Sequence, residues 1–394
     1  MGTLRPGPAP AHYLLLAAIH RICQPGPKSE VADWYSRTIL ASLWGFPAGR
    51  FTAQAFWDCF DRIGTGSEND ELDQAQSRLL GLWKDRQLVG RRLLAYDTTN
   101  FHTYVASTNS RNQLPQRGHN KQGRHNLRQV GSSYVLDRDN GLGLCHHVYP
   151  GSVADADELP AALARIVTLL DRNQIGRDTV TLVLDKGFAA LANTLELQQA
   201  QVGWISALPW NQAPAELRAR DAGQLSPCSG LPGIRAAAEP HMVHGQNYLC
   251  VMKYSSSFAA EQLQSLTTSV AKAMQNLRRL ALELAKPKAR FEERGIRDKV
   301  GRWLSPDFLA ELVRYDLQSI NGRWHLQFEF DHQAWLALMA HRLGRTVLLT
   351  NRLDWTAEQV VAAYTGQQRI EQVFRGLKDG DWLNWGPMHH WTDR

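Results

Sequence analysis

The sequence is poor in cysteine, and the few cysteines that it has are scattered. Its 394 residues include five cysteines, an odd number, and no two of them form a CxxC pair. Disulfide frameworks and structural zinc sites need closely spaced pairs, so we interpret these cysteines as reduced thiols of a cytoplasmic protein. His241 and His244 follow Cys228, but their spacing matches no standard zinc site. We therefore expect neither a disulfide scaffold nor a zinc centre.

Long hydrophobic runs are missing as well. No apolar stretch approaches the roughly 20 residues that a membrane-spanning helix needs. The N-terminal YLLLAAIH is short, and no small-residue cleavage site follows it, which favours a buried helix over a signal peptide. Hydrophobic residues still make up 43% of the chain, enough for a large core and two or three domains. We expect no membrane partner.

Acidic residues are missing from one long stretch, between Asp97 and Asp137. The basic residues of this stretch are Arg111, Arg117, Lys121, Arg124 and Arg128. The whole chain has a formal net charge of +6 and a pI of about 9.1. A basic balance suits a polyanionic partner, and a basic loop can contact DNA phosphates. A merely solvated loop is the alternative.

Hydrophobic periodicity predicts helices first and an α/β layer second. Residues 1–86 read as a helical region, in which Ser29 would cap a helix over 30–45 and Thr52 would cap the next one. Residues 87–210 predict three antiparallel strands followed by helix, strand, helix and strand. This order is typical of an α/β layer with a mixed sheet.

The second half predicts a separate subdomain and then a return to the first pattern. Residues 211–343 begin with a segment rich in Pro, Ala and Gly and include a long helix over 258–285. A charged linker is expected over 286–302. Residues 344–394 contain a further strand and one helix over 356–378, with Thr356 as its N-cap.

Three carboxylates from distant parts of the chain form the candidate centre. Asp97 lies within the first β-rich segment, and Asp185 ends a buried strand, where ligand sites of open α/β sheets gather. Each aspartate could instead cap a turn or a helix. Together with Glu371 they make a set of hard oxygen ligands that favours Mg²⁺ or Mn²⁺.

The helix over 356–378 carries a polar stripe. Tyr364, Glu371 and Lys378 are seven residues apart, which brings them to nearly the same helix face, and Arg375 lies one turn beyond Glu371. A carboxylate among phosphate-binding groups suggests metal-assisted chemistry on a nucleic acid. A solvated amphipathic helix with ion pairs is the alternative.

These residues resemble a known family. YDTTNF around Asp97, LVLDKGF around Asp185 and the spacing of Tyr364, Glu371 and Lys378 are similar to the DDE transposases of bacterial insertion sequences. The branch with a Tyr-x₂-Arg-x₃-Glu-x₆-Lys signature is the most similar. Segments such as WISAL, RTVLLTNRLDW and IEQVFRGLKDG also look like that family, so the resemblance covers nearly the whole chain.

The resemblance implies a fold and a division into domains. It implies a ribonuclease-H-like catalytic core with a mixed sheet, formed by residues 87–210 and 344–394. A mixed α/β insertion domain at 211–343 would interrupt this core, and the helical region at 1–86 would precede it.

The resemblance also implies an activity and a site. Asp97, Asp185 and Glu371 would be catalytic and would ligate two Mg²⁺ or Mn²⁺ ions about 3.5–4 Å apart. The residues expected to contact DNA are Tyr364, Lys378, Arg369 and Arg375. The activity would be endonuclease cleavage at insertion-sequence ends followed by strand transfer into target DNA. The expected partners are DNA and, in the synaptic complex, a second copy of the chain, in the bacterial cytoplasm at the nucleoid.

The sequence departs from the family pattern at two places. Gln367 occupies the signature's arginine position, and Arg369 lies two residues further on. The chain also stops soon after the signature, at HHWTDR, from which we expect a C-terminally truncated copy. The alternative function is therefore a truncated, non-catalytic transposase remnant that only binds element-end DNA.

Overall fold

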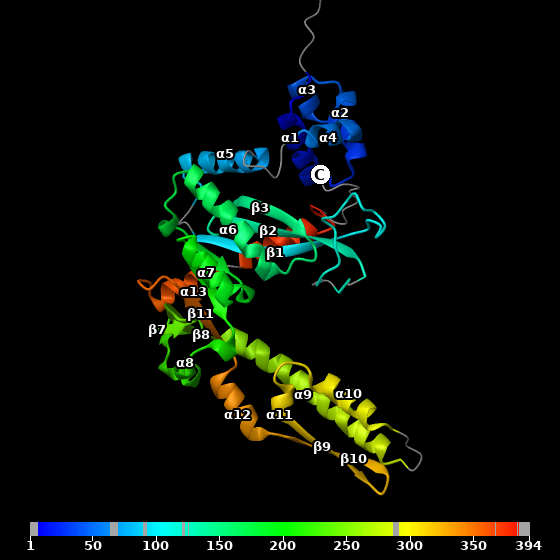
Figure 1. The fold of residues 1–394 in the computed structure, drawn as a ribbon, viewed down its shortest axis with the longest axis vertical. Helices are drawn as coiled ribbons and strands as arrows, with labels where there is room; N and C mark the ends of the chain where they lie inside the picture. The colour runs from blue at the N-terminus through cyan, green and yellow to red at the C-terminus, as the bar shows by residue number, and fades with distance from the viewer. Residues whose placement is uncertain are drawn as a thin grey trace, which may run out of the picture. The chain divides into compact units, whose positions relative to one another are not determined.

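The computed structural model describes residues 7–63, 70–89, 93–119, 123–124, 126–286, 291–366, 368–383 and 385. The chain divides into two compact units. Unit 1 comprises residues 1–206 and 363–394, and unit 2 comprises residues 207–362. Figure 1 draws the elements of both units. The predicted four-part domain division stays a prediction.

Unit 1 begins with the predicted helices. They are α1 (Pro10–Cys23), α2 (Val31–Ser36), α3 (Ile39–Trp44), α4 (Ala53–Phe60) and α5 (Glu71–Asp85). Thr52 caps α4 as predicted, because its hydroxyl accepts a hydrogen bond from the Ala55 amide at 3.2 Å. Tyr35, Phe51 and Phe56 are fully buried and form the core of the first four helices.

The prediction of one helix over 30–45 was wrong. A short 3₁₀ turn (Lys28–Glu30) contains Ser29, which therefore does not act as the cap, and α2 and α3 follow separately. Thr38 interrupts them: its backbone is extended, and its hydroxyl donates to the Tyr35 carbonyl at 2.9 Å. Threonine and serine hydroxyls compete in this way with the helical hydrogen bonds of the backbone.

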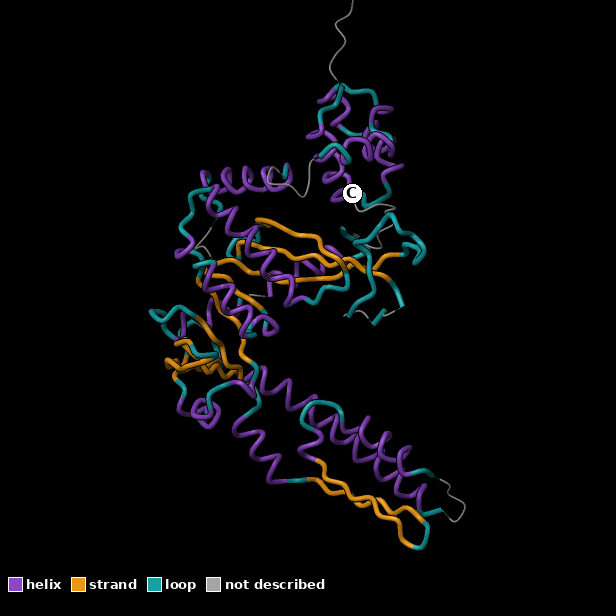
Figure 2. The backbone as a smooth tube through the Cα atoms, in the orientation of Figure 1, coloured by secondary structure: helices purple, strands orange, loops and turns teal. Residues whose placement is uncertain are grey.

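The sheet of unit 1 has the predicted mixed α/β, ribonuclease-H-like order. Its strands are β1 (Leu93–Thr103), β2 (Arg128–Asp137), β3 (Gly143–Pro150), β4 (Thr181–Leu184) and β5 (Gly203–Leu208). They lie in the order β3-β2-β1-β4-β5. The pairs β1–β2 and β2–β3 are antiparallel, whereas β1–β4 and β4–β5 are parallel. Figure 2 shows these strands in orange. The fold class predicted from the sequence is confirmed.

Side chains of β1 alternate between two helix-covered faces of this sheet. Ala95 and Phe101 pack with Ile370 and Phe374 of α14 (Gln368–Lys378), so the odd-numbered residues of β1 face α14. The even-numbered residues face the other side. There α6 (Asp155–Arg172) lies against β3, and α7 (Leu191–Gln199) packs on α6. Side chains of a strand alternate with a period of two, so Asp97 belongs to the α14 face.

The prediction of one helix over 356–378 was also wrong. The structure has α13 (Ala357–Thr365) and α14, separated by a turn at Gly366. Thr356 does cap α13, since its hydroxyl accepts from the Gln359 amide at 3.2 Å. Arg138 caps the C-terminal end of α13, because its Nη1 donates to the Ala363 carbonyl at 3.1 Å. In a continuous helix that carbonyl would accept from the residue four positions later.

Unit 2 contains an antiparallel sheet, a layer of helices and a hairpin. The sheet strands lie in the order β11 (Arg345–Thr350), β8 (Gln246–Ser255), β7 (Ile234–Val243) and β6 (Ser226–Pro227). The helices are α8 (Ala215–Ala219), α9 (Ser256–Leu284), α10 (Glu293–Leu304), α11 (Leu309–Leu312) and α12 (His332–His341). The hairpin pairs β9 (Val313–Ile320) with β10 (Arg323–Phe330).

The predicted charged linker over 286–302 was wrong, because most of it forms α10. Ile296, Val300 and Leu304 are four residues apart and are all buried in the core of unit 2. Residues at this spacing form the apolar face of a helix. The prediction missed it because most other residues of the segment are charged. Within the described part of the chain, every helix is too short or too polar to span a bilayer.

Candidate functional site

The two predicted aspartates lie side by side on neighbouring parallel strands. Tyr96 of β1 is aligned with Leu184 of β4 in the last pair of their register. Asp97 and Asp185 each follow that pair directly, so they occupy equivalent positions on strands about 4.8 Å apart. Asp97 is half-buried and Asp185 is exposed. Sheet topology thus brings together two residues that are far apart in the chain.

Both carboxylates are turned onto the backbone that follows them. Asp97 Oδ1 accepts a hydrogen bond from the Thr98 amide at 2.7 Å, and Asp185 Oδ1 accepts one from the Lys186 amide at 2.7 Å. Both aspartates therefore act as backbone caps, which was the alternative expected from the sequence. One oxygen of each carboxylate accepts a hydrogen bond from the following amide.

Tyr364 is within electrostatic range of the third carboxylate, Glu371. This half-buried tyrosine comes from the last turn of α13, and Glu371 comes from the first turn of α14. Burial raises the pKa of the Tyr364 hydroxyl, and three neighbouring carboxylates raise it further. In decreasing order of effect they belong to Asp185, Glu371 and Asp97. All three predicted metal ligands therefore lie within electrostatic range of one phenol.

The carboxylates are close without forming a closed ligand cluster. Among the described residues, no three His, Cys, Asp or Glu side chains are near enough together to hold a metal ion. The donor set nevertheless has the right chemistry, since three carboxylates offer the hard oxygens that Mg²⁺ and Mn²⁺ bind.

Lys378 lies on the same face of β1 as Asp97. Its Nζ donates to Thr99 Oγ1 at 2.5 Å and lies 5.4 Å from the centroid of the Phe101 ring. Thr99 and Phe101 follow Asp97 on the α14 face of the strand. The contact holds the lysine's positive charge about two residues along the strand from the aspartate.

The two arginines predicted to contact DNA are in different situations. Arg369 Nη1 donates to the carbonyls of Arg138, at 3.1 Å, and of Asp139. It therefore ties the start of α14 to the turn between β2 and β3. Arg375 is exposed on α14. Gln367, at the signature's arginine position, lies outside the described residues.

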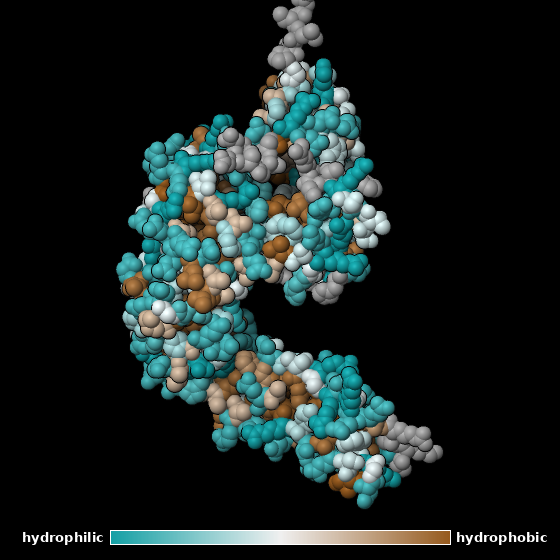
Figure 3. Space-filling model, in the orientation of Figure 1, coloured by the Kyte–Doolittle hydropathy of each residue, from teal (hydrophilic) through white to brown (hydrophobic). Residues whose placement is uncertain are grey.

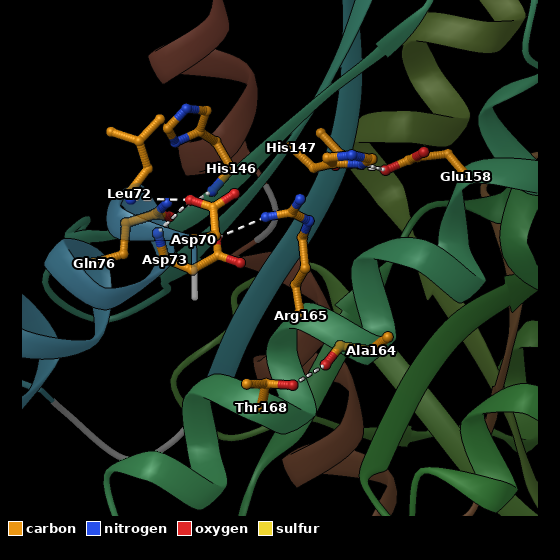
Figure 4. A network of polar contacts seen from close by, with 11 residues as sticks. Asp70, Leu72, Asp73, Gln76, His146, His147, Glu158, Ala164, Arg165 and Thr168 are labelled. Carbon is orange, nitrogen blue, oxygen red and sulfur yellow. Dashed lines mark hydrogen bonds and ion pairs between the residues drawn. The ribbon is translucent and has the colours of Figure 1, made fainter. Parts of the chain in front are cut away.

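The sequence analysis missed a buried polar network behind β1. Glu158 of α6 is 3% exposed, and its Oε1 lies 2.6 Å from His147 Nδ1 and accepts from Ser133 Oγ at 3.2 Å. Figure 4 shows His147 pointing at Glu158, with the Asp73–Arg165 ion pair of 2.6 Å nearby. Ser133 is the register partner of Thr98, the residue after Asp97. One signal was available: Glu158 is at helical spacing from the buried Ala162 and Ile166.

The basic loop has both structural and exposed arginines. Arg128 is structural, because its guanidinium donates to the carbonyls of Ala106 and Asn112, each at 3.1 Å. Arg124 Nη1 lies 3.1 Å from His102 Nε2 near the end of β1 and is exposed. Lys121 lies outside the described residues. The proposed DNA contact of this loop stays a prediction.

Several solved structures are similar to this chain at low identity. The piggyBac transposase synaptic complex with hairpin DNA matches at 12% identity and a TM-score of 0.33, over 65% of this chain and 52% of that one. A Mos1 transposase paired-end complex matches at 13% identity and a TM-score of 0.21, over 52% of this chain and 60% of that one. A Mos1 paired-end complex with Mn matches at 12% identity and a TM-score of 0.20, over 53% of this chain and 61% of that one. The matches thus span about half to three fifths of those chains, and at these TM-scores they assign no residue a role.

The comparison of sequence patterns is more informative. No curated protein matches this chain. The family described as "Transposase DDE domain" matches residues 89–386, which is most of the chain and contains Asp97, Asp185 and Glu371. This chain belongs to the DDE-domain transposase family.

Proposed function

We propose that this protein is a DNA transposase that cuts the ends of a mobile element and joins them to target DNA. The observation that supports the proposal is the β1–β4 register, which sets Asp97 and Asp185 at equivalent positions, in a chain of the DDE-domain family. The finer features expected from the resemblance, a bacterial insertion sequence and the Tyr-Arg-Glu-Lys branch, belong to the same proposal.

The carboxylates would hold divalent metal. Asp97, Asp185 and Glu371 would take two Mg²⁺ or Mn²⁺ ions, whose preferred ligands are carboxylate oxygens. When bound, such ions neutralise phosphate charge and lower the pKa of a coordinated water.

The other residues of the site would position the DNA backbone. The Tyr364 hydroxyl is protonated at neutral pH, as an ordinary tyrosine is, so it can donate a hydrogen bond to a phosphate oxygen. Lys378, positioned by its bond to Thr99, would contact a phosphate, and the exposed Arg375 would add a second positive contact. Two copies of the chain would bring two element ends together.

A plasmid cleavage assay tests the proposal. A supercoiled donor plasmid carrying the element ends is incubated with the protein and Mg²⁺. We expect strand cleavage by the wild type and a loss of at least about a thousandfold for Asp97→Asn, Asp185→Asn or Glu371→Gln, because each removes a ligand charge. Asp157→Asn is the matched control: it makes the same charge change on an exposed residue of α6, on the other face of the sheet.

The assay also separates the alternative function. Cleavage that persists in the three variants would refute the assignment of the site. Binding of element-end DNA by the wild type with no cleavage in Mg²⁺ or Mn²⁺ would favour a DNA-binding remnant.

A further inference from the structure

A hollow between two helices of unit 2 has an unusual concentration of positive charge. It lies between α9 and α10 and has a volume of about 440 Å³. Its lining residues are Asn276, Arg279, Leu280, Glu283, Lys299, Arg302 and Trp303. Figure 3 shows that the surface over α10 is mostly hydrophilic. We refer to these seven residues as the α9–α10 pocket.

The charges of the α9–α10 pocket are not balanced from within. Its three cationic side chains belong to Arg279, Lys299 and Arg302, and its one acidic side chain is Glu283. Within the described ranges, none of the three cations forms an ion pair with a carboxylate. Like charges gathered in one hollow repel each other, so an anion that enters it is attracted by all three.

The remaining cations of α10 differ in this respect. Arg297 Nε lies 2.8 Å from Glu293, and Arg294 Nε lies 4.0 Å from Asp298, each one helical turn away. Acidic residues of the same helix thus neutralise the arginines outside the pocket. The helix therefore separates its paired cations from those that line the hollow.

The rest of the lining suits a nucleic acid. Leu280 is 1% exposed and packs in the core of unit 2, and Trp303 packs against the same core while still reaching the hollow. The ring lies beside the cations and can contact a sugar or a base, while the Asn276 amide can donate to a phosphate oxygen. Exposed Arg278 of α9 and exposed Lys286, two residues beyond the end of α9, add further positive charge.

We infer that the α9–α10 pocket binds a backbone phosphate of DNA, at a site separate from the carboxylate centre of unit 1. Identifying the partner as DNA rests on the proposed function. The same three cations would attract any phosphate, so the test has to separate a DNA phosphodiester from a free phosphate.

The test compares two arginines of the α9–α10 pocket with one arginine of α10 outside it. Arg302→Ala, Arg279→Ala and the control Arg294→Ala are made in the full chain, and binding of a fluorescent element-end duplex is measured by anisotropy over a range of salt concentrations. Losing one phosphate contact should lower the slope of log affinity against log salt by about 0.9 and weaken binding about three- to tenfold. Arg294, whose side chain is 93% exposed and outside the pocket, should change neither quantity.

Two further measurements keep the inference falsifiable. Arg302→Lys should retain most of the affinity, because it keeps the charge, and thermal unfolding should show that every variant is folded. Equal effects of Arg302→Ala and Arg294→Ala would overturn the inference. The inference would also be overturned if the pocket variants bind DNA normally while inorganic phosphate quenches the fluorescence of Trp303. The Trp303→Phe variant identifies the part of the fluorescence that comes from Trp303.

The results for the α9–α10 pocket and for the proposed transposase function can be told apart. If the wild type cuts DNA and the pocket variants bind it normally, the inference is wrong and the function stands. If the wild type does not bind DNA at all, the proposed function is wrong and the inference with it.

Discussion

Lys378 and Thr99 join the last turn of α14 to the strand that carries Asp97. The lysine Nζ donates to Thr99 Oγ1 at 2.5 Å, and Thr99 lies two residues beyond Asp97 on the same face of β1. Two residues of a strand span about 7 Å. The threonine thus holds the lysine's positive charge on the same face of β1 as Asp97.

A double-mutant cycle tests this coupling. Lys378→Met should weaken binding of element-end DNA about five- to tenfold, because a charge-assisted phosphate contact is lost. Thr99→Val keeps the β-branched shape and removes the hydroxyl, so it should weaken binding only while Lys378 is present. Binding affinities of the wild type, both single variants and the double variant should give a coupling of about 0.5–1 kcal/mol. Strict additivity would show that Thr99 does not position the lysine.

Gly366 gives the turn between α13 and α14 its close packing. A Cβ at this position would lie 2.4 Å from Arg138 Cδ, the side chain that takes the Ala363 carbonyl. Gly366→Ala should therefore displace Tyr364 relative to Glu371 and lower the cleavage rate about ten- to a hundredfold. Gly380→Ala is the control, because a Cβ there meets nothing within 4 Å. Wild-type cleavage by Gly366→Ala would mean that this turn does not set the geometry of the site.

Arg369 and Arg375 should separate a structural from a DNA-binding role. Arg369→Ala loses the bonds to the carbonyls of Arg138 and Asp139 and should lower the free energy of unfolding by about 1 kcal/mol, with little change in the salt dependence of DNA binding. Arg375→Ala should do the reverse and reduce the salt slope by about 0.9. Denaturant unfolding and anisotropy titrations measure the two effects. A reduced salt slope for Arg369→Ala would restore it as a DNA contact.

Glu158 should stabilise the sheet from behind. Glu158→Ala leaves Ser133 and His147 without their buried acceptor and should lower the free energy of unfolding by about 2–3 kcal/mol. Glu158→Gln keeps an acceptor oxygen and should cost less. The neighbouring Asp157→Ala changes an exposed carboxylate and is the control. If the Glu158 and Asp157 variants unfold at the same denaturant concentration, the network contributes nothing measurable.

Much of the fold could be predicted from the sequence because it rests on local patterns. Alternating apolar residues and turn residues indicated β1, β2 and β3, and the α/β order that follows them indicated the parallel strands. Asp185 could be located because strand ends are marked by hydrophobic periodicity. The errors came where side chains compete with local preference: the Thr38 hydroxyl interrupts one predicted helix, and Arg138 takes the carbonyl that would continue another.

The sequence by itself determined the mixed α/β class, the basic balance and three candidate carboxylates, since composition and periodicity are properties of the chain alone. Only the tertiary structure decided which of these residues meet. The register of β1 with β4 sets Asp97 beside Asp185, and the packing of α14 on β1 brings Lys378 to the face of β1 that carries Asp97. Tertiary contacts also assigned Arg369 to the turn between β2 and β3, because a partner 231 residues away in the chain leaves no mark on local sequence.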